Sequence, residues 1–145
     1  MPRPKPTPAD PSARFRRTRD AHTRETAEDY VEAIAELIGA KGEARVRDLA
    51  RLMGVSHVTV SRIVARIADE GLVESSRYRP LALTPAGKRL AQRARERHDI
   101  VVRFLIAIGV PAAQASIDAE GMEHHVGNAT LKAMENLVAR SLPRP

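Results

Sequence analysis

The sequence predicts a mainly α-helical protein in which an N-terminal winged helix-turn-helix, with three helices and a two-stranded wing, is joined by a long helix to a second helical unit. Three observations predict this fold class. Apolar residues recur at helical spacing along most of the chain, two of these helical segments are separated by a short turn at Gly54, and the segment after them has the pattern of a β-hairpin.

Composition limits the function classes that are open to the chain. With 145 residues, 43% of them hydrophobic, it can form one domain or two small ones. The absence of cysteine excludes disulfides and thiolate metal sites, and two Tyr, two Phe and no Trp disfavour binding of single strands by base stacking. Because there is neither an N-terminal apolar region nor a membrane-spanning apolar run, we expect a cytoplasmic protein with no membrane partner.

Charge is unevenly distributed along the chain. Residues 25–40 carry five acidic and no basic side chains, whereas residues 41–97 carry thirteen basic and six acidic ones. The acidic segment suits a cation, and the basic segment suits a polyanion such as DNA.

The first helix is predicted after a disordered N-terminal arm. Residues 1–21 are rich in proline and arginine and too poor in apolar residues to order themselves. A helical pattern then begins near Thr26 and ends near Gly42. On the side opposite its apolar residues lie Asp29 and Glu32, which by position alone are either part of a solvated face or a pair of metal ligands.

The helix-turn-helix is predicted in the segment ARVRDLARLMGVSHVTVSRIVARI. Its first helix ends at Gly54, and Ser56 is a natural N-cap for the second. Because the second helix of this motif enters the major groove of DNA, the polar residues near its start are candidates for DNA contacts, with a purely structural helical hairpin as the alternative. These candidates are Ser56, His57, Val58, Thr59, Ser61 and Arg62.

The wing and the long helix are predicted next. Residues 72–74 and 81–83 read as two strands, so Arg77 and Arg79 between them lie where a wing reaches phosphate or the minor groove. Thr84 then caps a long helix whose first half is basic and whose second half is apolar. His98 lies where this character changes, and it is either structural or a metal ligand.

The stretch DAEGMEHHV, residues 118–126, concentrates carboxylate and imidazole groups. If it is helical, Glu120, Glu123 and His124 stand at positions i, i+3 and i+4 and share one face. These three residues are plausible as half of a metal site, although a solvated helix face has the same pattern.

Several of these segments, in this order and spacing, resemble the diphtheria-toxin-repressor family of metal-dependent transcription regulators, and more closely its manganese transport regulator branch. The resemblance covers roughly residues 26–142, and it is carried by the segments ETAEDYVEAI, GEARVRDLA, GVSHVTVSRIVARI, YRPLALTPAG, RHDIVVRFL and DAEGMEHHV.

The resemblance implies a metal pocket with ligands from three segments. The implied ligands are Asp29, Glu32, His98, Glu120, Glu123 and His124. The iron-responsive branch of the family has a methionine in place of Asp29 and a cysteine in place of Glu120. Four carboxylates and two imidazoles make a hard site suited to Mn²⁺ or Fe²⁺, with one or two ions per chain. His125 is not among the implied ligands and is expected to be structural.

The resemblance also implies a Mn²⁺-responsive regulator of metal-transport genes, expected to be a repressor, which binds a double-stranded DNA operator as a homodimer and is not an enzyme. The expected divisions are a disordered basic arm at residues 1–21, a DNA-binding domain at 22–88 and a helical metal-binding and dimerisation domain at 89–145. Three alternatives are a winged-helix regulator that responds to iron, one that responds to a small organic effector, and a hydrolytic metalloenzyme.

Overall fold

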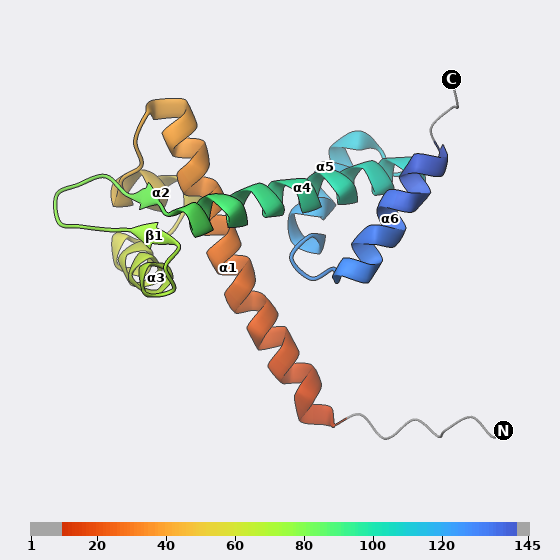
Figure 1. Cartoon of the computed structure of the whole chain (residues 1–145), viewed down its shortest axis with the longest axis horizontal. Helices are drawn as coiled ribbons and strands as arrows, with labels where there is room; N and C mark the ends of the chain where they lie inside the picture. The colour runs from red at the N-terminus through yellow and green to blue at the C-terminus, as the bar shows by residue number, and fades with distance from the viewer. Residues whose placement is uncertain (1–9, 142–145) are drawn as a thin grey trace.

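The computed structural model describes residues 10–141, which form six helices and one small antiparallel sheet (Figure 1). The predicted fold class is confirmed, with three helices and a two-stranded wing followed by a long helix and two further helices. The elements are α1 (Pro11–Lys41), α2 (Val46–Met53), α3 (His57–Asp69), β1 (Val73–Glu74), β2 (Ala82–Leu83), α4 (Pro85–Ala107), α5 (Ala112–Met122) and α6 (Asn128–Ser141).

Helix α1 begins earlier than the sequence predicted. The carboxylate of Asp10 accepts a hydrogen bond from the Ser12 amide at 3.0 Å, and Pro11 occupies the first helical position, which its fixed φ suits. The prediction of a disordered arm is therefore wrong for residues 11–21, which are helical, while residues 1–9 lie outside the described residues. The helix ends as predicted, at Gly42, which has a φ of 82°.

The helix-turn-helix is formed by α2 and α3. Gly54 ends α2 with a φ of 67°, and Ser56 caps α3 by accepting a hydrogen bond from the Thr59 amide at 3.2 Å. On α3, Val60, Val64 and Ile67 are buried, so this side of the helix packs on the core and the opposite side is exposed.

The wing is a short β-hairpin in which Val73 pairs with Leu83 and Glu74 with Ala82. The start of α4 is fitted closely to this hairpin. Thr84 caps α4, as predicted, and its hydroxyl donates a hydrogen bond to the Gly71 carbonyl at 2.6 Å. A Cβ atom on Gly87 would lie 2.0 Å from the Leu72 carbonyl oxygen, so this position requires glycine.

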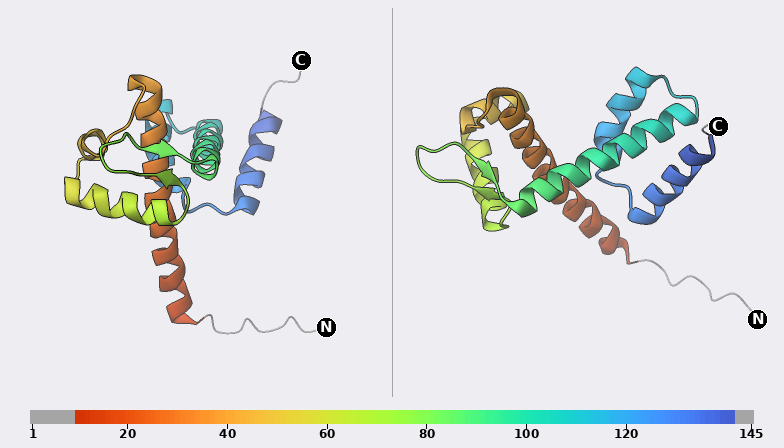
Figure 2. Two further views of the ribbon diagram at one scale, coloured as in Figure 1. Left: turned by 60° about the vertical axis from the view of Figure 1, so that its left-hand side comes forward. Right: turned by 45° about the horizontal axis from the view of Figure 1, so that its top comes forward.

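The chain has two hydrophobic cores, and α4 passes through both. The first core joins α1, α2, α3, the hairpin and the start of α4, and it includes Ile34, Leu49 and Ile67. The second joins the end of α4 with α5 and α6 around Val101 and Ala119. Figure 2 shows α1 crossing α4 between the two units, with its N-terminal part extending away from them. No helix of the described residues is long and apolar enough to cross a membrane.

Candidate metal centre and DNA interface

The middle of α1 lies against the turn that follows α5, and both segments bring acidic or imidazole side chains to this junction. The turn begins where α5 ends at Met122, and it carries Glu123 and His124, which are only 2% and 5% exposed. From α1, Glu28 is buried and Asp29 is half-buried at the same place. Burial of so many polar groups is costly unless they have partners.

His124 is surrounded by carboxylates. Its Nδ1 atom lies 2.6 Å from Glu28 Oε2, and its Nε2 atom lies 3.0 Å from Asp29 Oδ1 and 3.3 Å from Glu123 Oε1. His98 of α4 lies beside another carboxylate, with its Nε2 atom 3.2 Å from Glu120 Oε1. Three elements and one turn thus converge on this pocket.

Glu32 belongs to the same electrostatic cluster. Burial raises the pKa of its carboxyl group, and the negative charges of Asp29 and Glu120 raise it further, against the opposite effect of His124. The structure therefore brings all six sequence-predicted ligands to one region, although their ligand atoms do not all meet at one point. At this pocket, one ligand atom each of Glu25, Asp29 and His124 lie within 4.8 Å of one another.

Two pocket residues have strongly displaced pKa values. Burial and the nearby Glu32 carboxylate raise the pKa of Glu123 to about 8. Burial acts to lower the pKa of His124, but the carboxylates of Asp29 and Glu28 outweigh it and raise the pKa to about 10. At neutral pH the metal-free pocket therefore holds a protonated Glu123 and a charged His124.

The pocket fits a divalent metal ion. Among the described residues, four buried side-chain polar atoms lack a hydrogen bond, and three of them belong to predicted ligands: His98 Nε2, Glu123 Oε2 and His124 Nε2. The close contacts of the two imidazole nitrogens with carboxylates thus lack hydrogen-bond geometry. Buried polar atoms without partners call for an explanation, and carboxylate and imidazole ligands that share a cation supply one.

Besides Glu25, two residues at the pocket were not indicated by the sequence. Glu28 holds the Nδ1 atom of His124, as the second partner of a metal-binding imidazole commonly does. Arg97 of α4 donates hydrogen bonds to the Glu123 carbonyl at 2.7 and 3.1 Å and to the Val126 carbonyl at 2.7 Å. The only sign of either residue in the sequence is that it is charged and lies next to a predicted ligand, Glu28 before Asp29 and Arg97 before His98.

The predicted DNA contacts lie on the exposed side of α3 and on the wing. His57, Val58, Ser61 and Arg62 are exposed, whereas Thr59 is half-buried and Ser56 uses its hydroxyl group in the N-cap. Arg77 and Arg79 are exposed on the wing.

The wing also lines a concave surface that the sequence did not indicate. This surface runs from the wing to the start of α3, and Arg45 and Arg47, at the start of α2, line it together with His57. The two arginines add positive charge where a DNA backbone would pass.

A winged helix-turn-helix whose first helix carries a carboxylate and imidazole pocket defines a class of protein, the ligand-responsive DNA-binding regulator of transcription. Two family models match the chain. Residues 22–81 match the iron dependent repressor N-terminal DNA binding domain, and residues 84–141 match the iron dependent repressor metal binding and dimerisation domain.

Curated relatives agree with these models. The transcriptional regulator MntR of Escherichia coli O157:H7 is 50% identical over 119 residues, which are 82% of this chain and 77% of the relative. The HTH-type transcriptional regulator MntR of Lysinibacillus sphaericus is 37% identical over 77% of this chain and 80% of its own. The chain therefore belongs to the iron-dependent, or diphtheria-toxin, repressor family, in its MntR branch, and its relatives are regulators and not enzymes.

Solved structures show the same fold. A manganese-dependent transcriptional repressor in complex with manganese has a TM-score of 0.69 and 26% identity, over 78% of this chain and 52% of that one. The IdeR protein of T. acidophilum has a TM-score of 0.63 and 27% identity, over 75% and 52%. This chain thus spans about half the length of these two solved proteins.

Proposed function

We propose that this protein is a Mn²⁺-responsive transcriptional repressor of metal-transport genes. The observation that carries the proposal is the set of three buried polar atoms, on His98, Glu123 and His124, that lack hydrogen bonds in a pocket rich in carboxylates. The likeness to MntR regulators and to a manganese-dependent repressor supports the choice of metal.

The metal would be held by the six ligands that the family resemblance implies. Asp29 and Glu32 bind from α1, His98 from α4, and the other three, Glu120, Glu123 and His124, from the end of α5 and its turn. Four carboxylates favour a hard cation, so Mn²⁺ and Fe²⁺ fit better than an ion that prefers sulfur. The clustering of negative charge is sufficient for one or two ions per chain.

Metal would act on DNA binding through α1. This helix packs in the first core through Ile34 and Leu37, and the same helix carries Asp29 and Glu32 on its other side. Ligands shared between α1 and the turn after α5 tie the DNA-binding unit to the second helical unit. Metal then selects the arrangement of the two units that it binds best, with a coupling of about 1–3 kcal/mol.

DNA binding would follow the geometry of a dimeric helix-turn-helix. We propose that α3 enters the major groove through Arg62 and Thr59 and that the wing contacts phosphate through Arg77 and Arg79. Dimerisation through the C-terminal helices would place two α3 helices about 34–36 Å apart, which is one turn of DNA. The domain division at residues 22–88 and 89–145 and a cytoplasmic location are part of this proposal.

The experiment compares the metal response of DNA binding in matched variants. Operator fragments are first recovered from a random DNA pool with the Mn²⁺-loaded protein, and affinity is then measured by fluorescence anisotropy with Mn²⁺, with Fe²⁺ and with a chelator. We expect Mn²⁺ to tighten binding by about 5–150-fold. Glu123→Gln should lose this response, whereas Glu135→Gln, a change at an exposed position of α6, should keep it. DNA affinity that is the same with Mn²⁺ and with chelator would overturn the proposal.

A further inference from the structure

A stripe of metal-ligand side chains runs along one side of α1, well beyond the candidate metal centre. His22, Glu25, Asp29 and Glu32 follow one another at intervals of three, four and three residues, which places them on the same side of the helix. Asp29 and Glu32 belong to the proposed manganese pocket. His22 and Glu25 lie about one to three turns closer to the N-terminus and are not needed there.

The turn after α5 presents a second imidazole to this part of the stripe. The Nε2 atom of His125 lies 3.0 Å from Glu25 Oε2, and the Nδ1 atom of His22 lies 3.4 Å from the same oxygen. The two imidazole rings meet edge to face, with their centroids 5.6 Å apart. One nitrogen of each histidine and one oxygen of Glu25 all lie within 4.8 Å of one another.

We propose that His22, Glu25 and His125 form a second divalent cation site, next to the manganese pocket, for an ion that prefers imidazole ligands, such as Zn²⁺ or Co²⁺. Atoms bound about 2.1 Å from a tetrahedral ion are about 3.4 Å apart, so both contacts of Glu25 Oε2 have nearly the required length. Only small shifts of side chains would be needed to admit the ion.

The ligand set separates this site chemically from its neighbour. The manganese pocket is dominated by four carboxylates, whereas the second site has two imidazoles and one carboxylate. Imidazole nitrogen suits Zn²⁺, Co²⁺ and Ni²⁺, and an ion held by two histidines and one glutamate keeps a fourth position open for water.

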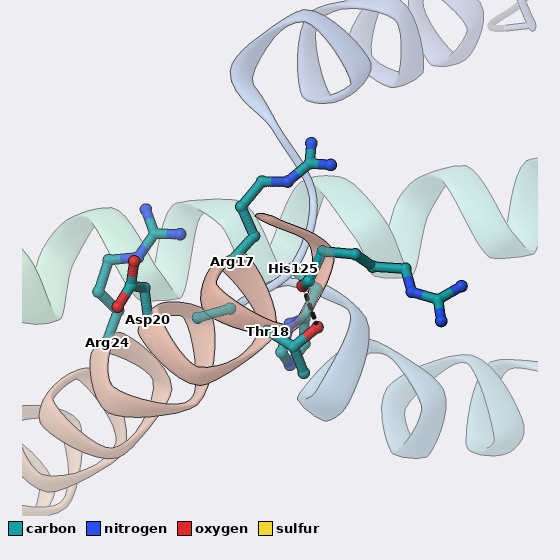
Figure 3. Close-up of a pocket in the computed structure, with 7 residues that line it drawn as sticks. Arg17, Thr18, Asp20, Arg24 and His125 are labelled. Carbon is teal, nitrogen blue, oxygen red and sulfur yellow. Dashed lines mark hydrogen bonds between the residues drawn. The ribbon is translucent and has the colours of Figure 1, made fainter. Parts of the chain in front are cut away.

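The site is accessible from solvent. The side chains of His22, His125 and Glu25 are 65%, 40% and 27% exposed. His125 also lines a pocket beside the N-terminal part of α1 (Figure 3). The guanidinium groups of Arg17 and Arg24 point away from His125 there, and Arg14 and Asp20 also line the pocket.

An ion at this site would connect the exposed N-terminal part of α1 to the turn that carries His124. The side-chain contacts that join these segments are the hydrogen bond between His125 and Glu25, which is exposed and therefore weak, and the edge-to-face contact of His22 with His125. Three metal–ligand bonds would hold the two segments together more firmly.

The test counts bound Co²⁺ on the parent protein, on three variants of the two metal sites and on one control variant. Co²⁺ is used because its visible absorption reports imidazole ligands and coordination geometry. We expect the parent to bind one more Co²⁺ per chain than His22→Gln and than His125→Gln, and to show an absorption band that both variants lack. Glu123→Gln alters the manganese pocket but keeps the second site, so it should retain that band even if the proposed manganese response is absent.

The control is His57→Gln, which removes an exposed histidine of α3 that belongs to no such cluster. It should match the parent in both the number of ions and the spectrum. If His22→Gln binds as much Co²⁺ as the parent, with the same spectrum, the second site does not exist and the cluster is only a hydrogen-bonded contact.

Discussion

Arg97 fixes the turn on which two of the proposed metal ligands lie. Its guanidinium group donates to the backbone carbonyls of Glu123 and Val126, across 26 and 29 residues of sequence. These bonds are made by a charged donor in a half-buried place, where such bonds are stronger than neutral ones. Arg97 is therefore a positioning residue, which orients Glu123 and His124 through the backbone.

Replacing Arg97 by alanine should weaken metal binding without removing a ligand. The turn would lose three hydrogen bonds, and we expect Mn²⁺ affinity to fall by about 10–100-fold, as is typical when a group that orients metal ligands is lost. Calorimetry with Mn²⁺ measures this. Arg95→Ala, on the exposed side of α4, is the matched control and should bind Mn²⁺ like the parent. An unchanged affinity in Arg97→Ala would show that the turn holds its shape without it.

At the residue scale, the sequence indicated ligands better than it indicated their partners. The spacing of Glu120, Glu123 and His124 indicates half of a metal site, and the family resemblance implies that they are ligands, although Glu123 and His124 lie in the turn after α5 and not on a helix. Glu28 and Arg97 act across 96 and 26 residues of sequence, on His124 and on the Glu123 carbonyl. Such contacts depend on how helices pack against one another, and no spacing along the chain encodes this.

At the scale of elements, Gly87 determines how closely α4 approaches the wing. Any side chain at this position would meet the carbonyl oxygen of Leu72, which is backbone and cannot move aside as a side chain does. That carbonyl also accepts a hydrogen bond from the Thr84 amide at 3.1 Å, so α4 and the hairpin share this contact.

Gly87→Ala should therefore destabilise the fold, by about 1–3 kcal/mol, because overpacking forces the backbone to shift. Urea denaturation of the metal-free protein measures the change in the free energy of unfolding. Gly121→Ala in α5 is a suitable comparison, because nothing lies within 4 Å of its added methyl group. That change should be neutral or stabilising, by up to about 1 kcal/mol. Equal stability of the two variants would contradict the close packing at Gly87.

The start of α1 shows why an element's boundary was mispredicted. The composition of residues 1–21 as a whole predicts disorder, although four of the five prolines precede residue 10 and most of the arginines follow it. Arginine favours helices, and Asp10 and Pro11 together make a good helix start. The starts of α3 and α4 were predicted more accurately because Ser56 and Thr84 are N-capping residues next to clear apolar patterns.

At the scale of the whole molecule, the pocket makes stability depend on pH. The pKa of Glu123 rises from 4.5 to about 8 on folding, and that of His124 rises from 6.5 to about 10. Both groups bind protons more tightly in the folded state. Their contribution to the free energy of unfolding is therefore fully present below the pKa values of the unfolded chain, and it is lost as the pH rises through the pKa values of the folded protein.

The metal-free protein should therefore lose stability between about pH 5 and pH 10, by up to about 1.4 kcal/mol per pH unit for each group. The loss should be steepest between about pH 6.5 and pH 8, where both groups contribute. Thermal unfolding in the presence of chelator, followed across this range, measures it. Glu123→Gln should show a shallower decline because one of the two groups is gone. Mn²⁺ binding should strengthen over the same range, because the ion displaces these protons. A Tm that rises with pH in the metal-free parent would contradict the arrangement.

The arrangement of two cores was predictable only in outline. The change from basic to apolar residues along the long helix indicated that it leaves one unit and enters another, and the helix does pass from one core to the other. The crossing of α1 and α4 that closes the metal pocket between the units was not encoded in that pattern (Figure 2). Two helices separated by more than forty residues meet through packing, which depends on every element between them.

The continuity of α4 has a mechanical consequence. A helix of 23 residues connects the two cores without a break, so the two units are joined by a rigid helix and not by a flexible linker. Motion of the DNA-binding unit relative to the second helical unit is limited to bending or twisting of α4. The contact of α1 with the turn after α5 limits it further. In a dimer, the two DNA-binding units would therefore lie at a nearly fixed distance from each other. Binding to DNA would need only a small rotation of each unit, with little loss of conformational entropy.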